Sequence, residues 1–191
     1  MAKKKMMDPG PFVLPMPTVL VGANVEGKPN FMTAAFVGIV NFKPAIVGCG
    51  LNPSHRTCDG IAENSTFSLN IPPRELVEKT DYCGLYSGNK VDKTDLFDVF
   101  YGELNTAPMI GECRLSAECK LIKTVPYEQD TLYLAEVVQV HADEDVVDGD
   151  NLDWQKIDPL IFTFPDKSYW GLGAHVADAW SVGKALKKAS G

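Results

Sequence analysis

Short strand-like runs, separated by turn-forming residues, are the feature of this sequence that most limits its fold. The runs are rich in β-branched and aromatic residues, whereas helical patterns are few and do not alternate regularly with strands. The strand-like runs lie at residues 18–23, 31–41, 45–51, 66–71, 113–125, 131–142, 159–164 and 168–172. Antiparallel strands with a few added helices predict a mainly β fold, a β-barrel with peripheral helices. The lack of βαβ units argues against a doubly wound nucleotide fold.

The strand over 131–142 has the clearest alternation. Its two faces are Leu132, Leu134, Val138 and Val140 on one side, and Tyr133, Ala135, Gln139 and His141 on the other. The second of these faces is the more polar. His141 is therefore expected to face solvent or an interface, with a catalytic role as the weaker alternative.

A single domain is expected from the length of 191 residues. We predict an N-terminal arm over 1–12, a barrel domain over 13–175 and a C-terminal helix over 176–191, whose lysines suit the end of a helix. No apolar run reaches the roughly 20 residues that span a bilayer, and the basic start is broken too early for a secretory leader. No membrane association is therefore predicted.

Charge and cysteine content exclude several function classes. The formal net charge of −7 argues against a nucleic-acid partner. Five cysteines, an odd number without CxxC spacing, predict neither a disulfide framework nor a metal site, and indicate a reducing, cytoplasmic location. Cys49 is expected in the core. Three scattered histidines (His55, His141, His175) support no Ser-His-Asp triad.

The stretch from Asn30 to Asn70 carries the chemistry. Ser54-His-Arg56-Thr57 follows a strand and opens a helix, with Ser54 as its expected N-cap. Backbone amides, hydroxyls and a guanidinium at a helix start suit a phosphate monoester. Taken alone, the stretch favours a plainer interpretation, in which Ser54 only caps the helix and Arg56 is solvated. A lysine-containing loop, residues 88–93, could complement the phosphate.

Several motifs, in this order and spacing, give the chain a resemblance to a known family over residues 15–173. The motifs are Asn30-x-Met-Thr33, Asn52-Pro-Ser54-x-Arg56-Thr57, Phe67-Ser-Leu-Asn70, Ser87-Gly88 with Lys93, and Tyr169-Trp170-x-Leu-Gly173. With them the chain resembles the flavin reductase-like, FMN-binding split-barrel proteins, and within these the flavoredoxin-type branch.

The resemblance implies a split barrel, a homodimer and FMN held without a covalent bond. It places backbone amides near Met32, Thr33 and Ala34 at the isoalloxazine edge, and Asn30 at the flavin or ribityl chain. It places the phosphate with Ser54, Arg56, Thr57 and Lys93. Ala35, Phe36, Asn52 and Trp170 complete the expected cofactor-binding set. Position 36 is often tryptophan in the branch, so the phenylalanine here cannot supply an indole hydrogen bond. For Trp170, flavin contact and barrel core remain equal alternatives.

The function that the resemblance implies is an FMN-binding, flavin reductase-like oxidoreductase, with NAD(P)H as one candidate electron donor. The alternative is a flavoredoxin-type carrier that exchanges electrons with protein partners and does not use NAD(P)H. A third, weaker reading is a flavin-binding protein without turnover. No acid or base is predicted for any of them, because the flavin supplies the chemistry.

Overall fold

A computed structural model gives the structure of the chain and describes residues 2–187. Its largest element is a seven-stranded antiparallel sheet with the strand order β3-β2-β6-β9-β10-β5-β4. The strands are β2 (Val19–Val25), β3 (Lys28–Ala34), β4 (Val37–Asn41), β5 (Ile46–Leu51), β6 (Thr66–Asn70), β9 (Leu115–Pro126) and β10 (Thr131–Ala142). The mainly β prediction is therefore confirmed.

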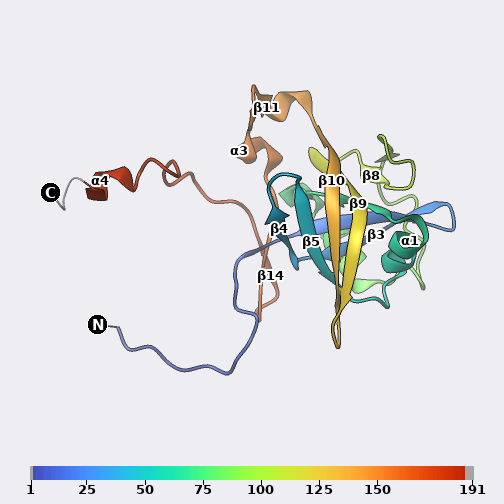
Figure 1. Ribbon diagram of the computed structural model, residues 1–191, viewed down its shortest axis with the longest axis horizontal. Coiled ribbons are helices and arrows are strands. Elements are labelled where there is room, and N and C mark those ends of the chain that lie inside the picture. Colours follow the sequence, from blue (N-terminus) through green and yellow to red (C-terminus); the bar gives the residue numbers. More distant parts are fainter. Residues whose placement is uncertain (1, 188–191) are drawn as a thin grey trace.

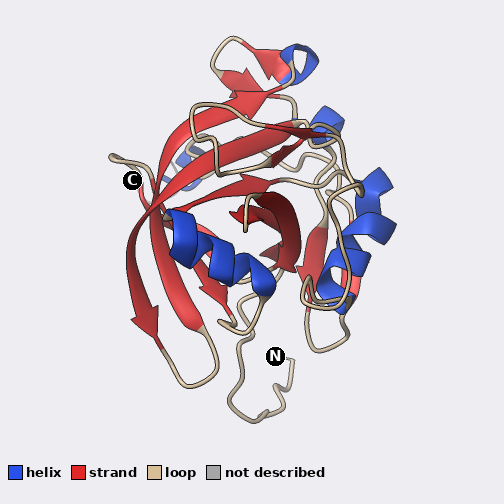
Figure 2. Ribbon diagram, turned by 90° about the vertical axis from the view of Figure 1, so that its right-hand side faces the viewer, coloured by secondary structure: helices blue, strands red, loops and turns tan. Residues whose placement is uncertain are grey.

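The sheet curls around an apolar interior, and helix α1 (Arg56–Asn64) lies across its open end (Figure 2). Cys58 and Ile61 of this helix are buried against the inward residues of the strands. These residues are Val19, Val21, Ala23, Met32, Ala34, Cys49, Leu51, Phe67, Leu69, Cys119, Tyr133 and Ala135. Burial of this apolar set supplies the main driving force for closing the barrel.

Strand β2 is buried on both faces along its whole length. While its odd-numbered residues point into the barrel, Leu20 packs outward with Phe31, Phe97 and Ile110 in a second apolar cluster. That cluster is covered by the 3₁₀ turn η1 (Arg74–Leu76) and by helix α2 (Val77–Leu85), through Leu76 and Cys83. Helix α2 thus lies along the outer side of β2 and β3.

Smaller elements complete the described structure. A three-stranded sheet joins β1 (Met16–Pro17), β13 (Ile161–Thr163) and β14 (Ser168–Trp170). Two short hairpins pair β7 (Val99–Phe100) with β8 (Met109–Ile110), and β11 (Val147–Asp148) with β12 (Asn151–Leu152). The 3₁₀ turn η2 (Glu144–Val146) precedes β11, and the short helix α3 (Trp154–Ile157) precedes β13.

The single strand predicted over 31–41 is wrong, because the chain breaks at Ala35 and Phe36. Before the break β3 pairs with β2, and after it β4 pairs with β5 at the other edge of the sheet. The Phe36 carbonyl still accepts a hydrogen bond of 2.8 Å from the Gly50 amide. The break is the place where the chain passes from one edge of the sheet to the other.

Strand β10 has the predicted bounds, but its better-buried face is the one that looked more polar. Tyr133 and Ala135 are buried in the barrel, whereas Leu132 and Leu134 are only half-buried. Bulges after Leu134 and Val137 change the register, which a simple alternation cannot show. Further along, His141 is about one-third exposed and its Nε2 lies 2.7 Å from Oε1 of the fully buried Glu118.

Both ends of the described chain run away from the barrel (Figure 1). Residues 2–13 and 172–186 are exposed throughout. The helix predicted over 176–191 is shorter than expected: α4 covers only Lys184–Lys187, and residues 188–191 lie outside the described part. No helix of the described residues is long and apolar enough to cross a membrane.

Candidate functional site

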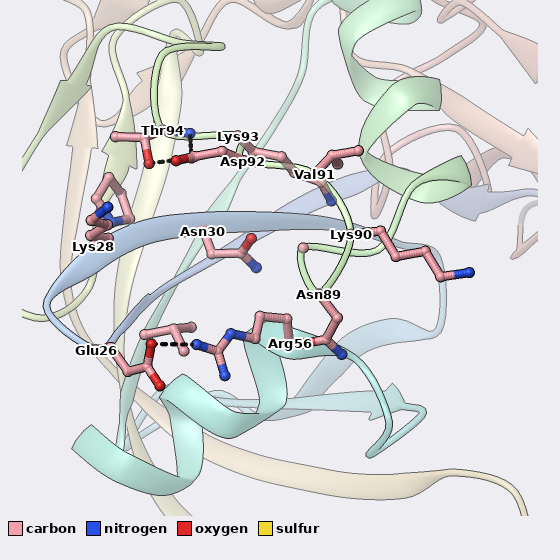
Figure 3. Close-up of a pocket in the computed structure, with 13 residues that line it drawn as sticks. Glu26, Lys28, Asn30, Arg56, Asn89, Lys90, Val91, Asp92, Lys93 and Thr94 are labelled. Carbon is pink, nitrogen blue, oxygen red and sulfur yellow. Dashed lines mark hydrogen bonds and ion pairs between the residues drawn. The ribbon is translucent and has the colours of Figure 1, made fainter.

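Three adjoining pockets lie along strand β3. The outer pocket, of about 300 Å³, lies between β3, Arg56 and the loop 88–94 (Figure 3). The inner pocket, of about 100 Å³, shares Asn30, Arg56 and Lys93 with it. The edge pocket, of about 220 Å³, lies at the break after β3 and shares Met32 and His55 with the inner pocket. Because neighbouring pockets share walls, they form one elongated site.

The start of helix α1 forms the lower wall of this site. His55, rather than Ser54, is the N-cap residue, and its side chain makes no capping hydrogen bond. The Ser54 hydroxyl instead donates 2.7 Å to Oδ1 of Asn52, which also accepts from the Ser54 amide at 3.0 Å. The predicted cap is therefore wrong: the Asn52 side chain forms a local turn with Ser54 and takes its hydroxyl.

Arg56 points into the outer pocket from the first turn of α1. Its guanidinium is 2.8 Å from the Glu26 carboxylate and 3.6 Å from that of Asp59. The Arg56 side chain is 28% exposed and that of Glu26 is 78% exposed, so water competes with this pair. Arg56 thus lines a cavity and is not merely solvated, and its present partner is an exposed surface carboxylate that an anion could displace.

Asn30 lies between Arg56 and the loop 88–94 (Figure 3). Its Nδ2 donates 2.7 Å to the Thr57 hydroxyl, so β3 and α1 are joined by a buried hydrogen bond. Gly88 passes so close to Asn30 that a Cβ there would overlap Oδ1. The site therefore needs glycine at this position to bring the loop onto Asn30.

Lys93 is only 3% exposed, yet its ammonium has no carboxylate within ion-pair distance among the described residues. It donates to the carbonyl oxygens of Phe31, at 2.9 Å, and Cys83, at 3.1 Å. Burial lowers the pKa of Lys93 because the charged form has lost water. A buried cation with only neutral acceptors is costly, and an anion in the pocket that it lines would offset that cost.

The edge pocket lies between two backbone segments, and Asp130 is the one carboxylate among its described wall residues. Residues 32–36 form one wall and residues 50–52 the other. The Ala35 and Phe36 amides have no hydrogen-bond acceptor within the described part of the chain. The Thr33 hydroxyl is already used, because it donates to the Thr80 carbonyl. This end can therefore offer backbone donors to a planar polar ligand.

His55 belongs to both the inner and the edge pocket and was not predicted as a site residue. Burial lowers the pKa of His55, the positive charge of Lys93 lowers it further, and Asp130 acts in the opposite direction. Asp130 and Phe162 also line the edge pocket. They come from the β9–β10 turn and from β13, and no local motif in those segments signals this position.

Most of the predicted cofactor-binding residues are brought together. Asn30, Met32, Arg56, Thr57 and Lys93 line the inner pocket, and Thr33, Ala34, Ala35, Phe36 and Asn52 line the edge pocket. Two predicted residues are not among the pocket walls. Ser54 is exposed beside Asn52, and Trp170 is 56% exposed, with its Nε1 2.9 Å from the Thr163 hydroxyl. Trp170 therefore occupies neither the core nor the pockets.

The cysteines behave as apolar residues. All five are buried and unpaired. Cys49 has no exposed surface, as predicted, and burial raises the pKa of its thiol to about 12. Cys83, in the wall of the inner pocket, has its pKa raised to about 11 by burial. Neither thiol is a nucleophile at neutral pH.

Comparisons with known proteins give matches over most of the chain. The sequence profile of the flavin reductase like domain matches residues 12–166. The chain is similar to a flavoredoxin from Methanosarcina acetivorans, with 46% identity, coverage of 97% of this chain and 100% of that one, and a TM-score of 0.93. It is also similar to the flavoredoxin of Desulfovibrio vulgaris (Miyazaki F), with 33% identity, 95% and 100% coverage, and a TM-score of 0.87.

A third solved structure shares the fold alone. It is an FMN-binding protein from Thermus thermophilus, 21% identical, covering 93% of this chain and 99% of that chain with a TM-score of 0.76. Together with the two flavoredoxins it confirms the split-barrel architecture that the resemblance implied.

Proposed function

The chain belongs to the flavin reductase-like family, and from this premise we propose that it is an oxidoreductase that transfers hydride or electrons through non-covalently bound FMN. The elongated site along β3 would hold the cofactor, with its phosphate at the Arg56 end and its ring at the edge pocket. FMN, when bound, supplies the redox chemistry. The chain's own groups anchor, orient and shield it. Residues 13–175 are the proposed FMN-binding unit.

The buried Lys93 is the observation that carries this proposal. Its ammonium lacks an anionic partner among the described residues, and it lines the same pocket as Arg56, Asn30 and Thr57. A phosphate monoester brings the negative charge that this wall lacks, and it accepts several hydrogen bonds at once. A neutral ligand would leave the cost of burying Lys93 uncompensated.

When a phosphate binds at this end, Arg56 must exchange its present ion-pair partner for the phosphate. Arg56 now pairs with Glu26, and the hydroxyl of Thr57 accepts from Asn30. We infer that phosphate takes the Arg56 guanidinium from Glu26, since that pair is exposed and weak. The Thr57 hydroxyl can still donate its own proton to a phosphate oxygen while it accepts from Asn30. Ser54 would contribute only if its hydroxyl left Asn52.

The ring end is proposed at the break after β3. The unpaired amides of Ala35 and Phe36 would donate to the polar edge of the isoalloxazine, where negative charge increases on reduction. His55, with its lowered pKa, would present a neutral imidazole where the two pockets meet. A neutral donor there orients the ligand without adding a charge.

The decisive test is cofactor binding followed by reduction. The purified protein is expected to be yellow and to hold one FMN per chain. Mixing it with NADH and with NADPH in a stopped-flow instrument should bleach the flavin absorbance if a nicotinamide is the donor. A colourless protein that also fails to bind added FMN would overturn the proposal.

A second candidate function is a flavoredoxin-type electron carrier that does not use NAD(P)H. The observation that favours it is the likeness to two flavoredoxins, at 46% and 33% identity. Flavin that stays oxidised with both nicotinamides but is bleached by reduced ferredoxin would select this function. Its partner would then be another electron-transfer protein.

We further propose a homodimer and a cytoplasmic location. Strand β4 and the following turn expose Ile39 at 78% and Phe42 at 90%, which is unusual for a monomer surface. The five unpaired cysteines support a reducing compartment. Light scattering of the FMN-loaded protein should give twice the chain mass of 20.9 kDa, and a single-chain mass at micromolar concentration would count against the dimer.

A further inference from the structure

An apolar groove of about 930 Å³ shares no wall residue with the three pockets of the flavin site. Its walls include Val19 and Leu69 from the barrel, Val37 and Ile39 from β4, and Trp154 and Leu160 from the segment around α3. A large apolar surface open to water is unfavourable, and soluble proteins usually cover it. The groove therefore needs an occupant that the described residues of one chain do not provide.

The C-terminal tail, residues 172–186, is an exposed segment with apolar side chains and no surface to cover them. Every residue in it is exposed, including Val176 at 96%, Trp180 at 94% and Leu186 at 76%. Its hydrogen bonds beyond Gly173 are local turns, such as Val182 amide to Asp178 carbonyl at 3.1 Å. The tail extends from the barrel into solvent (Figure 1). The described tail therefore has apolar side chains without a surface to pack on.

The tail starts at the rim of the groove. Leu172 and His175 line the groove, and the Gly173 carbonyl accepts from Nε2 of Gln155 at 3.3 Å. Trp180 is five residues beyond His175, a reach of about 17 Å for extended chain. In a two-fold dimer whose axis passes near this rim, each tail can therefore reach the groove of the other copy.

We propose that the C-terminal tail of one copy covers the apolar groove of a second copy, with the Trp180 indole inside it, and that the exchange is reciprocal. The inference rests on the homodimer of the proposed function and not on FMN.

The first test follows the environment of Trp180 in the FMN-loaded full chain. The chain has three tryptophans, and Trp154 is kept because it is a wall of the groove, so the emission of Trp180 is obtained as the difference between Trp170→Phe and the double substitution Trp170→Phe, Trp180→Phe. At high protein concentration its emission is expected to be blue-shifted and protected from acrylamide. On dilution into monomers it should become red-shifted and quenchable. A Trp180 that is fully quenchable in the dimer overturns the proposal.

The second test measures dimer dissociation by light scattering and dilution. Trp180→Ala should raise the dissociation constant on the order of thirtyfold, the effect of losing a buried aromatic anchor. Removing residues 174–191 should do so at least as strongly. The control is Tyr127→Ala, a 69%-exposed aromatic at the β9–β10 turn outside the groove, which should change the constant less than about twofold.

Three outcomes would contradict the proposal. One is a dimer that tail removal does not weaken. Another is a dimer weakened by removing residues 1–12 and not by removing the tail, which would make the N-terminal arm the occupant. The third is a monomer at all concentrations, which would also refute the homodimer. FMN titration of the same samples separates these results from a failure of the flavin proposal.

Discussion

Replacing Arg56 by alanine is the sharpest test of where the phosphate lies. Arg56 lines both the outer and the inner pocket, and within the described part of the chain its ion-pair partners are Glu26 and Asp59. FMN and riboflavin differ only in the phosphate. Arg56→Ala should therefore weaken FMN binding and leave riboflavin binding nearly unchanged.

The size of the effect follows from the partners of Arg56. A hydrogen bond between charged groups contributes about 1.5–3 kcal/mol. Freeing Arg56 from Glu26 costs roughly 0.5 kcal/mol, since that ion pair is exposed at 28% and 78%. The net loss is then about 1–2.5 kcal/mol in FMN binding, which corresponds to roughly a fivefold to sixtyfold weaker affinity.

The assay is quenching of flavin fluorescence on titration into the apoprotein, at low and at high salt. Glu26→Gln is the matched control: it frees Arg56 in advance and should leave FMN affinity equal or slightly higher. Salt should weaken FMN binding in the wild type more than in Arg56→Ala. If the substitution weakens both flavins equally, or neither, the phosphate lies elsewhere and the orientation of FMN proposed here is refuted.

Three further predictions concern the same fold. Lys93→Gln should weaken FMN binding at neutral pH. In the wild type, FMN affinity should also fall as the pH rises through the burial-lowered pKa of Lys93, because the phosphate pairs with the protonated ammonium. A wild-type pH dependence that parallels that of the variant in the alkaline range would contradict this. Gly88→Ala should weaken FMN binding by pushing Asn30 aside, whereas Gly38→Ala, with open space around its Cβ, should not; equal titration curves for the two would refute the close approach. Glu118→Ala should lower the free energy of unfolding by about 2–4 kcal/mol in urea denaturation, since two loop amides and His141 lose their acceptor, and a loss under about 1 kcal/mol would refute that role.

The strands and the proposed phosphate end of the site could be predicted from the sequence, because each is formed by one continuous stretch of the chain. Alternation and turn residues located β2, β5, β6 and β10 closely. The segment from Asn52 to Thr57 pointed to the proposed phosphate end, since a helix start with hydroxyls and a guanidinium is contiguous in the chain. The family resemblance then supplied the cofactor, which no single motif specified.

Tertiary structure decided the features that depend on segments distant in the chain. The break at Ala35 and Phe36 arises because the sheet has two edges, and propensity alone predicts one continuous strand. The burial of Lys93 depends on carbonyls from β3 and α2, so an apparent loop lysine is a buried cation. Trp170, equally suited to core or flavin by sequence, is exposed and lines none of the three pockets along β3.

The C-terminal region also separates what the local sequence determines from what tertiary packing decides. Its composition predicts a helix over 176–191, but an amphipathic helix is stable mainly when its apolar face packs on a surface. In the described chain no such surface meets residues 176–183, which stay exposed, and only Lys184–Lys187 is helical. Local sequence thus determined which residues are apolar and which can donate or accept. The packing of distant segments decided which of them became core, site wall or unpartnered surface, because burial is a property of the folded chain and not of any single stretch.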